Sequence, residues 1–121
     1  GGRFEHSLAN VFLLEPFLGR GMDVVLFSGN TTVCSVGHPD RVGGYPPTIE
    51  ERAFYGEAGD WVSLLPISRE VTGVTTTGLR FPLTDATLRR GSTLGVSNEM
   101  LTEEARVRVD SGFLVVILTH R

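Results

Sequence analysis

The sequence predicts a mainly β protein, α+β overall, in which one helix and two strands precede a β-sandwich or jelly-roll-like barrel. The first observation is that apolar residues recur at helical spacing only near the N-terminus. The second is that short, β-branched-rich segments alternate with turn signals from residue 51 onward. Because a lone helix and two strands have apolar faces that need cover, we expect residues 1–36 to be the remnant of a larger α/β domain. Residues 37–121 would then form the β domain.

The N-terminal part is predicted to begin with a helix over residues 6–18. The apolar residues on one face of this helix are Leu8, Val11, Phe12 and Leu14. Residues 23–27 form an apolar run without alternation, which is typical of a buried parallel strand. A turn at residues 28–30 and a second strand at residues 31–36 follow, and the glycine- and proline-rich residues 37–47 predict a loop or linker.

Six further strands are predicted in the β domain. They cover residues 52–55, 61–66, 71–76, 79–83, 106–110 and 113–118. The Asp-Ser-Gly turn at residues 110–112 predicts that the last two strands form a hairpin. The last strand is apolar on both faces, which indicates either a central strand or a strand at a subunit interface.

The composition excludes several classes of function. The 121 residues carry a formal net charge of −3 with both signs interspersed, which does not favour nucleic acid as a partner. No apolar run approaches the roughly 18 residues of a membrane span. Cys34 is the only cysteine, so no internal disulfide is possible and a reducing, cytoplasmic setting is the simplest expectation. We interpret Cys34 as a small buried strand residue. The absence of lysine excludes a Schiff-base mechanism in this chain.

The first candidate site is the glycine turn that opens the predicted N-terminal helix. Free backbone N–H groups and the helix dipole make such a turn an anion site. Arg3 adds a bidentate phosphate donor, and Glu5 and His6 are candidates to contact a metal, a water or a hydroxyl. The alternative is an ordinary helix start, which the pattern alone favours.

The second candidate site is the threonine-rich segment at residues 75–83. Thr75 and Thr77 share one face of a strand, Arg80 follows a glycine bend, and Phe81 is a candidate to stack on a flat heterocycle. The alternative is an exposed threonine-rich strand that is followed by a core phenylalanine.

Ser97 and Asn98 form the third candidate site. Together they can bind the edge of a polar ring, or Ser97 can instead cap a short turn. The aspartates are scattered and the three histidines lack the spacing of metal ligands, so we predict no metal site in this chain.

Several of these segments resemble the thiamin pyrophosphokinase family. Gly-Gly-Arg-Phe-Glu-His-Ser-Leu-Ala-Asn at residues 1–10 is similar to a family segment that has Asp in place of Glu5. Val-Thr-Thr-Thr-Gly-Leu-Arg-Phe-Pro-Leu at residues 74–83 and Gly-Ser-Thr-Leu-Gly-Val-Ser-Asn-Glu at residues 91–99 match two further segments. Residues 60–66 and 105–117 resemble the strand that opens, and the hairpin that closes, the family's C-terminal domain.

The resemblance implies a longer enzyme that transfers a pyrophosphoryl group from ATP to the thiamin hydroxyl, giving thiamin diphosphate and AMP. It implies that residues 1–36 belong to a nucleotide-binding catalytic domain and residues 37–121 to a thiamin-binding domain. The family's acidic residues for Mg²⁺ and ATP lie in a part missing here, so we expect the chain alone to be inactive. The active site would lie between the subunits of a homodimer.

The resemblance also implies roles for single residues. Arg3 and His6 would bind nucleotide phosphate, and Glu5 would stand at a catalytic position. Phe81 would stack on the thiamin pyrimidine. The other residues that would line the thiamin pocket are Thr75, Thr77, Arg80, Ser97 and Asn98. Two alternatives from other classes stay open: a non-catalytic module that binds a thiamin-like ligand, and a dimerisation module.

Overall fold

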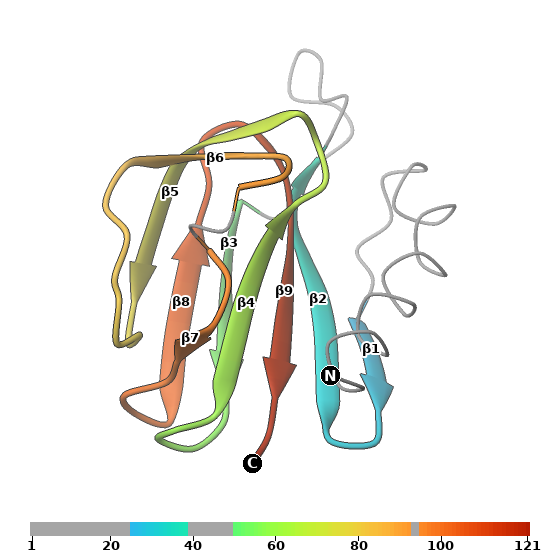
Figure 1. Cartoon of the computed structure of the whole chain (residues 1–121), viewed down its shortest axis with the longest axis vertical. Coiled ribbons are helices and arrows are strands. Elements are labelled where there is room, and N and C mark those ends of the chain that lie inside the picture. The colour runs from blue at the N-terminus through green and yellow to red at the C-terminus, as the bar shows by residue number, and fades with distance from the viewer. Residues whose placement is uncertain (1–24, 39–49, 93–94) are drawn as a thin grey trace.

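The computed structural model describes residues 25–38, 50–92 and 95–121 of the chain, and these form two antiparallel β-sheets (Figure 1). The strands are β1 (Val25–Ser28), β2 (Thr31–His38), β3 (Glu51–Tyr55), β4 (Trp61–Pro66), β5 (Glu70–Thr77), β6 (Ala86–Arg89), β7 (Asn98–Glu99), β8 (Glu104–Arg108) and β9 (Gly112–Thr119). The five-stranded sheet has the order β1-β2-β9-β4-β7, and the four-stranded sheet has the order β3-β8-β5-β6. This confirms the mainly β prediction, whereas the predicted helix over residues 6–18 lies outside the described residues.

The main hydrophobic core lies between the two sheets and holds them together. The five-stranded sheet contributes Val62 and Leu64 of β4, and the four-stranded sheet contributes Val71 of β5 and Val107 of β8. Burial alternates strictly along β8, as expected of a strand with one face on a core and one in solvent. At one edge, Nε of Arg52 in β3 donates a 2.8 Å hydrogen bond to the Ser35 carbonyl of β2, which ties the two sheets together.

Strand β9 is the central strand of the larger sheet, as one of the two sequence interpretations expected. It pairs with β2 on one side and β4 on the other. Leu114 and Val116 point into the core between the sheets. Phe113 and Val115 point to the opposite face, where they are also buried and pack with Val33. Burial on both faces explains the continuous apolar run.

The prediction of a parallel strand at residues 23–27 is wrong for the part that the structure describes. β1 pairs antiparallel with β2, and the two are joined by a turn at Gly29 and Asn30. A connection this short allows only antiparallel pairing, whereas an apolar run does not determine strand direction. The predicted loop at residues 37–47 is also wrong at its start, because β2 extends through His38. The rest of that loop, residues 39–47, lies outside the described residues.

The predicted hairpin of the last two strands does not form. β8 pairs with β3 and β5, whereas β9 pairs with β2 and β4 in the other sheet. The turn between them carries the chain from one sheet to the other, guided by a 2.9 Å hydrogen bond from the Asp110 N–H to the Thr72 carbonyl. Gly112 has a φ of 93°, and a Cβ there would lie 2.5 Å from the Glu70 carbonyl oxygen. The glycine therefore allows the close crossing of two chain segments.

The predicted strand at residues 79–83 is also wrong, because only Leu79 pairs, in an isolated bridge with Met100. Proline at position 82 has no N–H to donate, and the chain bends just before it, at Arg80 and Phe81. The sequence patterns missed β6 and β7, which are four and two residues long, because so short a segment shows no clear periodicity. None of the described segments contains a helix long and apolar enough to span a membrane.

Candidate functional site

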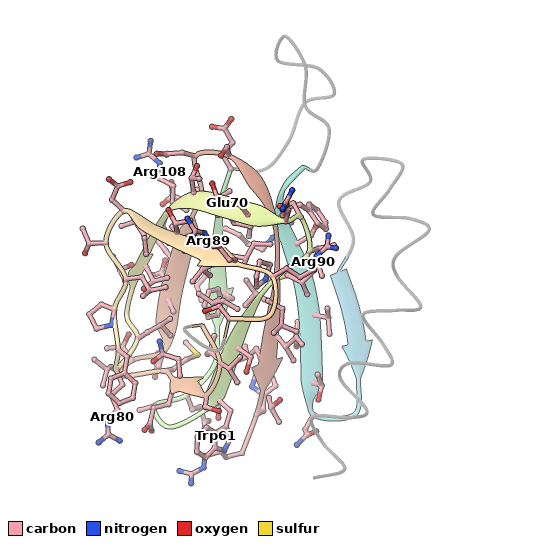
Figure 2. The ribbon with its side chains drawn as sticks, turned by 45° about the horizontal axis from the view of Figure 1, so that its top comes forward. Trp61, Glu70, Arg80, Arg89, Arg90 and Arg108 are labelled. Atoms are coloured by element: carbon pink, nitrogen blue, oxygen red, sulfur yellow. The ribbon has the colours of Figure 1, made fainter. Side chains whose placement is uncertain are left out.

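The loop that connects β5 to β6 carries an exposed aromatic ring. Phe81 is 60% exposed, although Leu79 two residues earlier is buried in the core. The alternative interpretation of Phe81 as a core residue is therefore wrong. Figure 2 shows the neighbouring Arg80 at the end of the sandwich that also carries Trp61, away from Glu70, Arg89 and Arg90.

The first part of the loop lies against β7 and the residues that follow it. Gly78 turns the chain with a φ of 79°, and a Cβ there would lie 2.4 Å from the Glu104 carbonyl oxygen. Its own carbonyl accepts a 2.9 Å hydrogen bond from the Leu101 N–H, and the Arg80 N–H donates a 2.9 Å bond to the Glu99 carbonyl. These bonds form a short ladder that ends at Arg80.

The side chain of Asn98 continues this ladder beyond its last backbone bond. The Phe81 N–H donates a 3.0 Å hydrogen bond to Oδ1 of Asn98, and Nδ2 of Asn98 donates a 2.8 Å bond to the Phe81 carbonyl. The Glu99 N–H donates a third bond, of 2.9 Å, to the same Oδ1. Because Asn98 is only 5% exposed, this amide is part of the framework beneath the loop.

The charged residues beside the ring form a second set of contacts. Arg80 and Glu99 form a 2.6 Å salt bridge, and the Arg80 guanidinium carbon lies 5.4 Å from the centroid of the Phe81 ring. Arg80 is exposed and Glu99 is partly buried, so the salt bridge lies at the surface and contributes about 0–1 kcal/mol to stability. Its consequence is geometric, because it holds a cation beside the ring, where a cation–π attraction of about 0.5–1 kcal/mol applies at exposed sites.

The threonines of β5 divide into structural and exposed members. The Thr75 hydroxyl accepts a 3.1 Å hydrogen bond from the Asp85 N–H. Thr76 is buried, and its hydroxyl accepts a 2.9 Å bond from the Leu83 N–H, which fixes the far side of the Phe81 loop. Thr77 is exposed at the end of the strand. The sequence patterns did not single out Thr76, since nothing local distinguishes it from its two neighbours.

Ser97 leads the chain into β7 through an unusual backbone conformation. It has a φ of 64°, in the left-handed region that non-glycine residues seldom adopt. Its N–H donates a 3.4 Å hydrogen bond to the Ser63 hydroxyl of β4, and its own side chain is exposed. The structure thus brings Arg80 and Phe81 together with Asn98 and its neighbour Ser97. The predicted phosphate and catalytic residues Arg3, Glu5 and His6 lie outside the described residues.

Comparison with known proteins identifies the family. The family model described as thiamin pyrophosphokinase, vitamin B1 binding domain, matches residues 48–114, which is more than half of the chain and includes Phe81 and Asn98. The chain belongs to the thiamin pyrophosphokinase family. The resemblance of the sequence motifs is therefore confirmed.

Named relatives agree with the family match. Thiamine pyrophosphokinase 2 of rice is 30% identical over 120 residues, which is 97% of this chain and 40% of the rice protein. Thiamine pyrophosphokinase of Bacillus subtilis is 27% identical over 117 residues, which is 97% of this chain and 50% of that protein. The crystal structure of the Bacillus subtilis enzyme has the same fold, with a TM-score of 0.72 at 24% identity over the whole of this chain and 52% of the other. The chain spans half the length, or less, of the curated relatives it matches.

The chain also contains a buried polar junction that the sequence patterns missed. Asp60, which is 3% exposed, accepts hydrogen bonds from the Glu57 N–H at 2.9 Å, the Arg121 N–H at 3.0 Å and Nδ1 of His120 at 2.9 Å. Asn30 holds the same end of the chain by a 2.9 Å bond from Nδ2 to the His120 carbonyl. Figure 1 accordingly shows the C-terminus at the end of the sandwich where β1 turns into β2.

The charge of Asp60 depends on these contacts. Burial by itself raises the pKa of the Asp60 carboxyl, since it disfavours the charged form. The backbone hydrogen bonds from Arg121 and Glu57, together with the hydrogen bond and charge of His120, outweigh burial and place the pKa below the usual value of an aspartate. The C-terminal Arg121 also stacks over Trp61, with its guanidinium carbon 5.5 Å from the ring centroid.

No metal centre is found in residues 25–38, 50–92 and 95–121 of this family member, since they contain no group of three or more His, Cys, Asp or Glu side chains close enough to hold an ion.

Proposed function

We propose that this chain supplies the thiamin-binding part of a thiamin pyrophosphokinase. The complete enzyme would transfer a pyrophosphoryl group from ATP to the hydroxyl of thiamin, giving thiamin diphosphate and AMP. Membership of the family and the names of the relatives support this proposal. The structural observation that carries it is the exposed ring of Phe81 on a loop that buried polar groups hold in place. A large exposed ring on a fixed backbone suits stacking on a flat heterocycle.

The proposed thiamin site consists of Phe81 and the polar residues around it. Phe81 would stack on the pyrimidine ring of thiamin. The other proposed members are Thr75, Thr77, Arg80 and Ser97, with the Asn98 amide beneath the loop that carries the ring. Thr77, Arg80 and Ser97 are exposed and carry hydrogen-bonding groups that a ligand can reach.

The phosphate chemistry would depend mainly on residues beyond those described. We propose that Arg3 and His6 bind nucleotide phosphate and that Glu5 stands at the catalytic position. ATP and Mg²⁺ would be bound mainly by residues that this chain does not contain, which is compatible with its covering only 40–50% of its relatives. We also propose that the enzyme is a cytoplasmic homodimer with the active site between its subunits. This chain alone would then be inactive.

Thiamin binding by the intact protein tests the proposal, with Phe81→Ala as the variant and Tyr55→Ala as its control. Tyr55 is a similarly exposed aromatic residue, at 64%, on β3, which is the edge strand opposite to β6 in the four-stranded sheet. Loss of an aromatic stack of about 0.5–1.5 kcal/mol lowers the affinity by a factor of about 2 to 12, measured by calorimetry. Tyr55→Ala should bind thiamin like the unchanged protein. Equal affinity in Phe81→Ala and the unchanged protein would contradict the proposed site.

Turnover by the complete enzyme, with the residues that bind ATP and Mg²⁺ present, distinguishes a pyrophosphokinase from the two alternatives. A pyrophosphokinase releases AMP only when both ATP and thiamin are present. A binding module would hold thiamin without nucleotide and release no AMP, whereas a dimerisation module would bind no thiamin and would be indifferent to Phe81→Ala.

A further inference from the structure

We propose that Asn98 is a positioning residue that presents Phe81 to the ligand and does not itself bind the ligand. This inference rests on the proposed function, in which the Phe81 ring stacks on thiamin. It changes the role that the sequence motif implied for Asn98, which was to line the pocket.

The hydrogen-bonding capacity of the Asn98 amide is almost fully used within the protein. An asparagine side chain has two acceptor lone pairs and two N–H donors. Both acceptor positions are taken, by the N–H groups of Phe81 and Glu99, and one donor is taken by the Phe81 carbonyl. The side chain is also 5% exposed, so little of it is accessible to a ligand.

The position of Asn98 in β7 explains why the side chain is needed. Its backbone pairs with Val62 of β4 on one edge of the strand. On the other edge, the backbone ladder to the loop ends at Arg80, whose N–H bonds to the Glu99 carbonyl. Phe81 comes next and would leave both its N–H and its carbonyl unpaired. The primary amide of Asn98 carries a carbonyl and an N–H at the spacing of a peptide group, so it satisfies both.

The next residue of β7 restricts the ring. Glu99 holds the Arg80 guanidinium, which lies beside the Phe81 ring. The two residues of β7 thus act on consecutive residues of the loop, Asn98 on the backbone of Phe81 and Glu99 on the side chain of Arg80. A strand of only two residues can in this way fix an aromatic ring that has few packing contacts of its own.

Asn98→Asp is the variant that tests this role, in the intact protein. A carboxylate keeps acceptors for the two N–H groups but has no N–H to donate to the Phe81 carbonyl, which it would instead repel. Asn30→Asp is the matched control, because it makes the same change in the β1–β2 turn at the opposite edge of the sheet. We expect Asn98→Asp to speed hydrogen exchange of the Phe81 amide by about tenfold or more, measured by NMR, as loss of one hydrogen bond implies. The exchange rate of the Val62 amide should not change in Asn98→Asp, and the exchange rate of the Phe81 amide should not change in Asn30→Asp.

A double-mutant cycle on thiamin affinity decides between positioning and contact. If Asn98 acts through Phe81, the double variant Asn98→Asp, Phe81→Ala binds thiamin no more weakly than Phe81→Ala alone. Losses that add in the double variant would overturn the proposal, since Asn98 would then contact the ligand directly. Hydrogen exchange that rises equally at the Phe81 and Val62 amides would also overturn the proposal, since Asn98 would then stabilise the pairing of β4 with β7 as a whole. Asn98→Ala serves as the second variant should Asn98→Asp fold poorly.

The two proposals fail in different ways. If Phe81→Ala leaves thiamin affinity unchanged, the proposed function is wrong. Unchanged exchange at Phe81 in Asn98→Asp shows instead that the amide does not hold the loop, whatever the protein binds.

Discussion

Two buried polar side chains fix the ends of loops in this sandwich, and they differ in charge. Asn98 makes three hydrogen bonds beneath the Phe81 loop with a neutral amide. Asp60 makes three hydrogen bonds beneath the C-terminal residues with a carboxylate. Both are almost completely buried, at 5% and 3% exposure.

The difference shows how much each region depends on its polar anchor. An amide buried with its partners gains little net free energy, and its role is to select one loop conformation. A buried carboxylate that is hydrogen-bonded contributes more, because its partners would otherwise be left unpaired beside a desolvated charge. We therefore expect the Asp60 junction to matter for stability and the Asn98 contact to matter for the site.

The largest effect should follow from Asp60→Ala. The change removes the acceptor for the N–H groups of Glu57 and Arg121 and for His120, and hydrogen bonds to charged groups contribute about 1.5–3 kcal/mol each. Because Glu57, His120 and Arg121 are not buried and can bond to water instead, these contributions do not add in full. We expect the free energy of unfolding, from urea denaturation, to fall by about 2–4 kcal/mol in total. The control is Glu70→Ala, which breaks only the exposed 3.3 Å pair with Arg89 and should cost less than about 1 kcal/mol. Equal losses in the two variants would show that the junction is no stronger than a surface pair.

The second effect is a dependence of stability on pH that only the carboxylate can produce. The folded-state pKa of Asp60 lies below its unfolded-state value, so the group adds stability above the unfolded-state pKa of about 3.9. This contribution is lost as the pH falls through the folded-state pKa. Asp60→Asn should be less stable at neutral pH, and its free energy of unfolding should decline less between neutral and strongly acidic pH. Parallel curves of unfolding free energy against pH for the two proteins would contradict the assignment.

Sequence patterns predicted the strands well where the signal is local. The bounds of β4 agree with the prediction at both ends, and the apolar run of residues 113–118 lies inside β9. Strand pairing was not predictable in the same way. The turn at residues 110–112 is a hairpin signal, yet it leads from one sheet to the other, because the partners of β8 and β9 are chosen by packing across the whole chain.

The candidate site shows the same limit. Phe81 and Asn98 were both singled out from the sequence, but the amide contact that joins them spans 17 residues and has no local signature. Asp60 was missed because His120, its side-chain partner, is 60 residues away. A sequence pattern can mark residues whose type is unusual for a strand, whereas buried polar networks depend on distant segments that only the fold brings together.

The smallest effect should come from Glu99→Gln, which tests the outer half of the Phe81 support. The variant removes the charge that holds Arg80 but keeps the backbone bond from the Arg80 N–H to the residue 99 carbonyl. Because the pair lies at the surface, with Arg80 exposed, the free energy of unfolding should fall by about 1 kcal/mol or less. Raising the ionic strength should narrow the difference in stability between the unchanged protein and Glu99→Gln, since salt screens the Arg80–Glu99 pair that only the unchanged protein contains. A loss of thiamin affinity in Glu99→Gln as large as that in Phe81→Ala would mean that holding Arg80 in place contributes as much to thiamin binding as the Phe81 ring does. The support would then lie in the charged pair more than in the buried amide.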